Sequence, residues 1–182
     1  MRLTAAKVFP VLVLMLAAFV PLTGCTGNNW SGAYTPGPLA ADALAAPGLI
    51  RPEVRVVMPE RMLDAMDAEA KFLAGRSRTR ASASPREQRD LQRIQFPMLG
   101  VYNDPDTTML IGTAEVTADK PIDPNDPGIA ASAQDAGASL VVVSVFPPGT
   151  PGGVPIETPA EGERGRAKET WRSVAWYYAP AR

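Results

Sequence analysis

The stretch 139–146, SLVVVSVF, decides what kind of fold this chain can adopt. It is an almost unbroken apolar run, rich in β-branched valine, and such a run is typical of a central strand that is buried on both faces of a sheet. A strand of this kind needs further strands beside it and helices above or below it. The rest of the chain must supply them.

A helix and a second strand are predicted immediately upstream. Asp126 is a good N-cap, Pro127 suits the first helical position and Gly137 suits the C-terminal end, so residues 126–136 are expected to be helical. Residues 109–117 (MLIGTAEVT) predict a strand in which Gly112 is a possible bulge. The order strand, helix, strand has the length of a right-handed βαβ crossover.

The remaining elements surround this unit. Residues 53–57 are a short strand candidate, and apolar residues at three- and four-residue spacing predict an amphipathic helix over 59–74. A second helix is expected from Ser84 to about Gln95. Residues 168–179 (KETWRSVAWYYA) predict a final, antiparallel strand. We therefore expect an α/β or α+β fold, with a small three- to five-stranded sheet that contains a βαβ unit and has helices on at least one face.

The aromatic residues of the final strand have two interpretations. Thr170, Arg172, Val174, Trp176 and Tyr178 share one face under strand alternation. Such a strand could be a sugar- or peptide-binding face, but aromatic rings more often cover a core, and packing is the favoured interpretation.

A basic segment precedes the second helix and continues into it. Its arginines are Arg76, Arg78, Arg80, Arg86, Arg89 and Arg93. It could contact anionic headgroups, lipopolysaccharide or the carboxylates of peptidoglycan. A solvated loop and helix face also explains the pattern. This interpretation is favoured, because charge runs alone say little about partners.

The N-terminus has the features of an export signal. Arg2 and Lys7 precede an apolar run over 8–20, which is too short to span a membrane as a helix. The residues that follow, Leu22-Thr23-Gly24-Cys25, resemble the bacterial lipobox. The resemblance implies cleavage between Gly24 and Cys25 and lipidation of Cys25, with attachment to a lipid bilayer. An ordinary secretory cleavage site and a simple N-terminal anchor are the alternatives.

These features give a domain plan. Residues 1–24 are the expected signal peptide, 25–51 a lipidated N-terminus and flexible tether, and 52–182 one globular domain with mobile loops at about 76–85 and 147–166. Trp30 and Tyr34, inside the tether, are expected at the headgroup interface or docked on the domain. Thr26 stands where Asp commonly retains lipoproteins at the inner membrane, so the outer membrane is favoured if the organism is Gram-negative.

The domain also bears a loose resemblance to small bacterial envelope domains of unknown function. The residues that carry it are Ala136–Val143, Leu110-Ile111-Gly112 and Trp176-Tyr177-Tyr178, within about 96–180. The resemblance implies the fold outline and no chemistry.

Composition excludes several functions. The chain has no histidine and one cysteine, so Ser-His-Asp and Cys-His triads and His-ligated zinc are not available. Removal of residues 1–24 leaves 16 basic against 19 acidic residues, which argues against nucleic-acid binding.

Three other groups of residues are candidate sites. The Asp-rich turns could hold calcium but match no EF-hand spacing, and turns use these residues anyway. The glycines of the 147–166 loop do not form a phosphate cradle, and its glutamates do not form a glycosidase pair. The residues of the Asp-rich turns are Asp104, Asp106, Asp119, Asp123, Asn125 and Asp126. The loop glycines are Gly149, Gly152 and Gly153, and the loop glutamates are Glu157, Glu161 and Glu163.

We therefore expect an envelope lipoprotein that is not an enzyme, with no cofactor, metal or catalytic residue. Its domain is expected to be a scaffold or interaction domain for an envelope protein or peptidoglycan. The alternative is a cell-wall or small-ligand binding module that uses the Arg76–Arg93 segment and the aromatic C-terminal strand.

Overall fold

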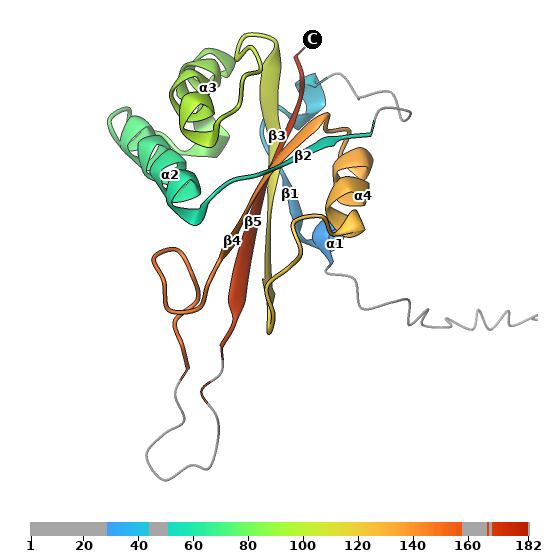
Figure 1. The fold of residues 1–182 in the computed structure, drawn as a ribbon. Helices are drawn as coiled ribbons and strands as arrows, with labels where there is room; N and C mark the ends of the chain where they lie inside the picture. The colour runs from blue at the N-terminus through green and yellow to red at the C-terminus, as the bar shows by residue number, and fades with distance from the viewer. Residues whose placement is uncertain (1–28, 44–50, 158–166, 168, 182) are drawn as a thin grey trace, which may run out of the picture.

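The fold is α+β, with one five-stranded mixed sheet and helices packed against both of its faces (Figure 1). The structure, a computed structural model, describes residues 29–43, 51–157, 167 and 169–181. The strands follow the order β1-β3-β5-β4-β2 across the sheet. The elements are α1 (Trp30–Ala33), β1 (Tyr34–Pro36), η1 (Ala40–Asp42), β2 (Glu53–Val56), α2 (Pro59–Ala74), η2 (Arg80–Ser82), α3 (Pro85–Leu99), β3 (Thr108–Ala118), α4 (Pro127–Asp135), β4 (Leu140–Phe146) and β5 (Trp171–Pro180).

The centre of the sheet confirms the fold expected from residues 139–146. Strand β4 is buried along nearly its whole length and pairs with parallel β2 on one side and antiparallel β5 on the other. Strand β5 also pairs antiparallel with β3, so β3 and β4 run parallel, with β5 between them. The crossover through α4 therefore passes over one strand. The register of β3 shifts between Leu110 and Gly112, as the glycine in that strand predicted.

Each face of the sheet has its own core. Helices α1 and α4 cover one face, where Ile129 and Ala133 pack with Val141 and Tyr177. Helices α2 and α3 cover the other, where Met62 and Phe96 belong to the core cluster of Val142 and Tyr178. Neighbouring side chains of β5 enter opposite cores because strand side chains alternate. The aromatic end of β5 is therefore interior on both sides.

Helix α2 has the predicted bounds, whereas α3 is longer than expected. It continues past Gln95 to Leu99 and includes Pro97, and Gly100 ends it with a positive φ of 64°. The continuation buries Phe96 and Leu99 against the sheet. This apolar gain outweighs the cost of Pro97, whose missing N–H removes one backbone hydrogen bond from the helix.

The tether predicted for residues 25–51 is wrong for 29–43, which belong to the domain. Trp30 is only 1% exposed and lies in the core beneath α4. Strand β1 pairs antiparallel with β3, and the Tyr34 hydroxyl donates to the carbonyl of Ile111 at 3.0 Å. Trp30 and Tyr34 are thus docked on the domain, because burying their rings repays the ordering of a Gly/Pro-rich segment. The lipobox, with Gly24 and Cys25, lies outside the described residues, as do 44–50.

A candidate ligand groove beside Arg80

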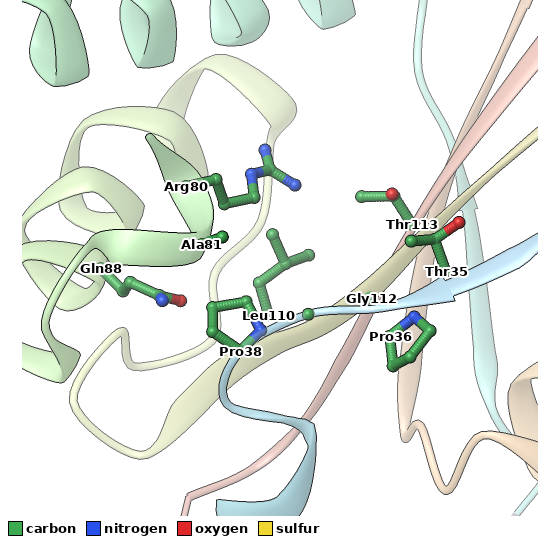
Figure 2. Close-up of a pocket in the computed structure, with 10 residues that line it drawn as sticks. Thr35, Pro36, Pro38, Arg80, Ala81, Gln88, Leu110, Gly112 and Thr113 are labelled. Carbon is green, nitrogen blue, oxygen red and sulfur yellow. The ribbon is translucent and has the colours of Figure 1, made fainter. Parts of the chain in front are cut away.

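Two adjoining hollows lie between the sheet and the α2–η2–α3 layer. The smaller, of about 200 Å³, lies between the segment 35–38, η2, α3 and β3 (Figure 2). The larger, of about 460 Å³, lies between α2 and strands β3 and β5. Both are lined by Arg80 and Thr113, so we treat them as one feature, the Arg80 groove. Its lining residues are Thr35–Pro38, Met66, Glu69, Ala70, Leu73, Arg80, Ala81, Gln88, Leu110, Gly112, Thr113, Glu115, Arg172, Val174 and Trp176.

Local capping fixes the turn that carries Arg80. Thr79 and Ser82 form a capping box around η2. Two residues later, Ser84 and Glu87 form a second capping box that starts α3. These hydrogen bonds hold the backbone of Arg80 between α2 and α3. Figure 2 shows its guanidinium extending from η2 toward the side of the groove where Thr113 and Thr35 lie.

Arg80 is paired with a carboxylate from α2. Its Nε and Nη2 both donate to Glu69, one to each carboxylate oxygen. Gln95 of α3 donates to the backbone carbonyl of Ala65 at 3.0 Å and to Glu69 at 3.4 Å. A carboxylate held from two sides keeps the guanidinium in one orientation.

Aromatic rings of β5 lie below this pair. The guanidinium carbon of Arg80 lies 5.1 Å from the centroid of the Trp176 ring, within cation–π range. Tyr178 is fully buried, and its hydroxyl has no hydrogen-bond partner among the described residues. Burial raises the pKa of Tyr178 above its usual value, because the phenolate cannot be hydrated there.

A second ion pair lies at the outer end of the groove. Arg172 of β5 donates to Glu115 of β3 at 2.7 Å and to the carbonyl of Gly152 at 2.8 Å. Its Nε is buried and has no partner in the part of the chain that the structure describes. A Cβ at Gly152 would lie 2.7 Å from Leu63 and 2.9 Å from Phe146, so this glycine allows the loop to pack closely and does not form a phosphate cradle.

The basic segment supplies one residue to the groove. Only Arg80, among the arginines predicted at 76–93 and described in the structure, lines it. Arg76, just after α2, lies over Phe72 of that helix, with its guanidinium carbon 3.6 Å from the ring centroid, and Arg93 is paired with Asp90 and Asp106 at 2.7 and 2.5 Å. Hydrogen bonding to Asp106 raises the pKa of Arg93. Arg76 and Arg93 thus make local contacts, whereas Arg80 lines the groove.

The aromatic strand does not form an exposed binding face. Trp176, Tyr177 and Tyr178 are all buried, so the face predicted as an alternative is wrong and the packing interpretation is confirmed. The groove nevertheless brings together one arginine of the basic segment and one aromatic residue of the final strand, since Arg80 lies over Trp176. Sequence reasoning missed Glu69, Thr113, Glu115 and the groove role of Arg172. A signal for Glu69 existed, because it interrupts the apolar stripe of Met62, Met66 and Leu73 at helical spacing.

The acidic turns use their side chains as backbone caps. Asp104 accepts from the backbone N–H of Asp106, Asp123 from that of Asn125, and Asp126 from that of Gly128, each at 2.8 Å. Within the described ranges, no three Asp, Glu or Cys side chains are grouped so that they could hold a metal ion. Of the three loop glutamates, Glu157 is exposed, whereas Glu161 and Glu163 lie outside the described part of the chain.

Comparisons with known proteins leave the fold and the groove as the basis for inference. No family model, curated protein or solved structure matches this chain. None of the helices in the described part of the chain is long and apolar enough to cross a membrane.

Proposed function

We propose that this chain is a lipid-anchored protein of the bacterial cell envelope, and that its domain binds an envelope component without catalysis. The proposed anchor is Cys25, with removal of residues 1–24. Support comes from the positive, apolar and lipobox segments that follow one another in the first 25 residues. Two or three acyl chains would hold the domain at the bilayer, since each buried CH₂ contributes about 0.8 kcal/mol.

The Arg80 groove is the observation that carries the binding proposal. It is concave, has an apolar lining from Met66, Leu73 and Val174, and presents a few oriented polar groups. This combination is typical of small-ligand sites, which measure roughly 300–1,000 Å³. Both of its carboxylates, Glu69 and Glu115, accept hydrogen bonds from arginines, an arrangement that suits recognition better than proton transfer. The groove therefore supports the cell-wall or small-ligand alternative.

A second candidate function, a protein scaffold, is favoured by the surface at the β2 edge of the sheet. Val56, Met58 and Tyr102 line a hollow of about 330 Å³ there, and Tyr102 is 91% exposed. Exposed apolar side chains that gather at one place are typical of interaction surfaces. Photo-crosslinking from position 102 in native membranes would test this function, because a scaffold should give a discrete crosslinked partner.

Two measurements test the main proposal. Radiolabelled palmitate should label the wild type and not Cys25→Ser; equal labelling of the two would contradict the anchor. The full lipidated chain in detergent should cosediment with peptidoglycan sacculi. The Arg80→Gln variant should lose this property, whereas Arg86→Gln, which changes an exposed arginine outside the groove, should retain it.

A further inference from the structure

We propose that the Arg80 groove recognises a terminal carboxylate joined to a small apolar body, as at the C-terminus of a short peptide. This inference rests on the proposed binding function and names the ligand chemistry.

Three polar groups of the groove are hydrogen-bond donors without a partner in the described part of the chain. Glu69 occupies Nε and Nη2 of Arg80, and within the described part of the chain Nη1 of Arg80 makes no hydrogen bond. Nε of Arg172 is buried without a partner. The Thr113 hydroxyl, which lines both hollows, has no partner among the described residues and can donate as well. A ligand that completes these groups must bring acceptors.

Both carboxylates of the groove are already engaged. Glu69 receives two hydrogen bonds from Arg80, and Glu115 receives one from Arg172. A cationic ligand would have to compete with these arginines for the carboxylates. The charges of the two pairs balance, so an incoming carboxylate meets no net negative charge. It gains a charge-assisted hydrogen bond from Nη1 of Arg80.

The guanidinium is held in place before the ligand arrives. The carboxylate of Glu69 holds two nitrogens of the Arg80 guanidinium, Nε and Nη2. The guanidinium carbon also lies 5.1 Å from the centroid of the Trp176 ring. An arginine held in this way loses little side-chain entropy on binding. Glu69 is therefore a positioning residue, and Arg80 is the residue that contacts the ligand.

The apolar walls limit the rest of the ligand. Met66, Ala70, Leu73 and Val174 line the larger hollow, and Leu110 lines the smaller one on the other side of Arg80. These side chains suit methyl or short aliphatic groups, which gain free energy when they are removed from water. A peptide C-terminus with small side chains combines such groups with a carboxylate. Peptidoglycan stem peptides and protein C-termini share this chemistry.

The test is calorimetric titration of the full lipidated chain in detergent micelles with defined dipeptides. The probes are acetyl-D-Ala-D-Ala, acetyl-L-Ala-L-Ala and the C-terminal amide of each. Both free acids should bind at least tenfold more tightly than their amides, because only the acids offer a carboxylate to Arg80. The stereochemical preference then distinguishes the sources. A preference for the D-dipeptide indicates the cell wall, and a preference for the L-dipeptide indicates a protein C-terminus.

Three variants make the result specific. Arg80→Gln should weaken binding of the free acid at least tenfold, and Arg86→Gln should leave it unchanged. Arg80→Lys keeps a cation beside Glu69 but lacks the fork, so it should weaken binding as well while the chain keeps its circular dichroism spectrum. Equal affinity for acid and amide, no detectable binding of either acid, or equal losses in Arg80→Gln and Arg86→Gln would each overturn the inference. Absence of palmitate labelling would overturn the envelope anchor alone, since the same titration can then be made with the chain that carries no lipid.

Discussion

Glu69 and Arg80, 11 residues apart in the chain, are joined by two hydrogen bonds that fasten the turn before α3 to α2. The Glu69 side chain is 12% exposed and that of Arg80 25% exposed. Gln95 of α3 also donates to Glu69, at 3.4 Å, so this one carboxylate connects three consecutive elements. The pair therefore contributes to the fold and, by orienting Arg80, to the groove.

Replacement of Glu69 by glutamine should lower the free energy of unfolding by about 1–2 kcal/mol. The variant leaves a partly buried guanidinium without its counter-ion, and that loss exceeds the value of an exposed pair. Glu53→Gln is the matched control, because Glu53 is 53% exposed where it pairs with Arg55 and such pairs contribute about 0.2–1 kcal/mol. Urea denaturation measures both. Equal losses in the two variants would contradict the structural role given to Glu69.

The sequence predicted the elements whose periodicity is strong and local. The valine run of β4, the apolar spacing of α2 and the Asp126-Pro127 start of α4 each specify one element, and each is found at the expected place. The end of α3 was missed because Pro97 suggests a boundary, whereas burial of Leu99 depends on the tertiary contact with the sheet. The packing of residues 29–43 on the domain was missed because it, too, depends on tertiary contacts.

Trp30→Ala tests whether residues 29–43 belong to the domain. Trp30 is 1% exposed in the core beneath α4, so the variant should lose about 3–5 kcal/mol of unfolding free energy, the usual cost of a large aromatic truncation. Tyr102→Ala, at a side chain that is 91% exposed, should change it by less than about 0.5 kcal/mol. If residues 29–43 were a tether, Trp30→Ala would leave the free energy of unfolding unchanged. Thermal or urea denaturation measures this free energy.

The candidate site was less predictable than the fold. Arg80 and Trp176 lie in the two segments that the sequence marks as candidate binding elements, but nothing local distinguishes Arg80 from Arg78 or Arg86. The distinction comes from Glu69 on the preceding helix and from the ring below, both of which are tertiary contacts. The groove's other lining residues, such as Thr113 and Pro36, meet only because β1 adds to the edge of β3.

Gly112→Ala should destabilise the docking of β1. A Cβ at this position would lie 2.4 Å from the Tyr34 ring, and the ring would have to move. We expect a loss of about 1–3 kcal/mol, as for overpacking in a core. Tyr34→Ala in the same chain should make Gly112→Ala nearly neutral, so the two changes should be strongly non-additive in a double-mutant cycle. Additive losses would place the strain somewhere other than at Tyr34.

The adjacent tyrosines of β5 should respond differently to loss of their hydroxyls. The hydroxyls of Tyr177 and Ser132 are 2.9 Å apart and hydrogen bonded, whereas the Tyr178 hydroxyl is buried and meets no partner within the described ranges. Tyr177→Phe should therefore cost about 1 kcal/mol, the usual net value of a hydrogen bond. Tyr178→Phe should be neutral or stabilising, since it removes an unsatisfied polar group. A larger loss for Tyr178→Phe than for Tyr177→Phe would contradict the arrangement in the α2–α3 core.

The same tyrosines predict how stability changes at alkaline pH. Burial raises the pKa values of Tyr34, Tyr177 and Tyr178 in the folded chain, while the unfolded chain has the ordinary value of about 10. Below pH 10 both states keep the phenolic proton, so these groups leave the free energy of unfolding unchanged. Above it the unfolded chain releases protons that the folded chain retains, and stability falls by up to about 1.4 kcal/mol per pH unit for each tyrosine.

Tyr178→Phe should flatten this alkaline decline, because Tyr178 is fully buried and its pKa is raised furthest. Urea denaturation at pH 9, 10 and 11 should show a slope smaller than that of the wild type by about half a proton over this range, and the difference should approach one proton near pH 11. The replacement removes the titrating group and leaves the ring that packs against Phe96, at 5.4 Å between centroids. An unchanged slope would mean that the Tyr178 hydroxyl reaches solvent in the folded protein. The floor of the groove beneath Arg80 and Trp176 would then be open rather than packed.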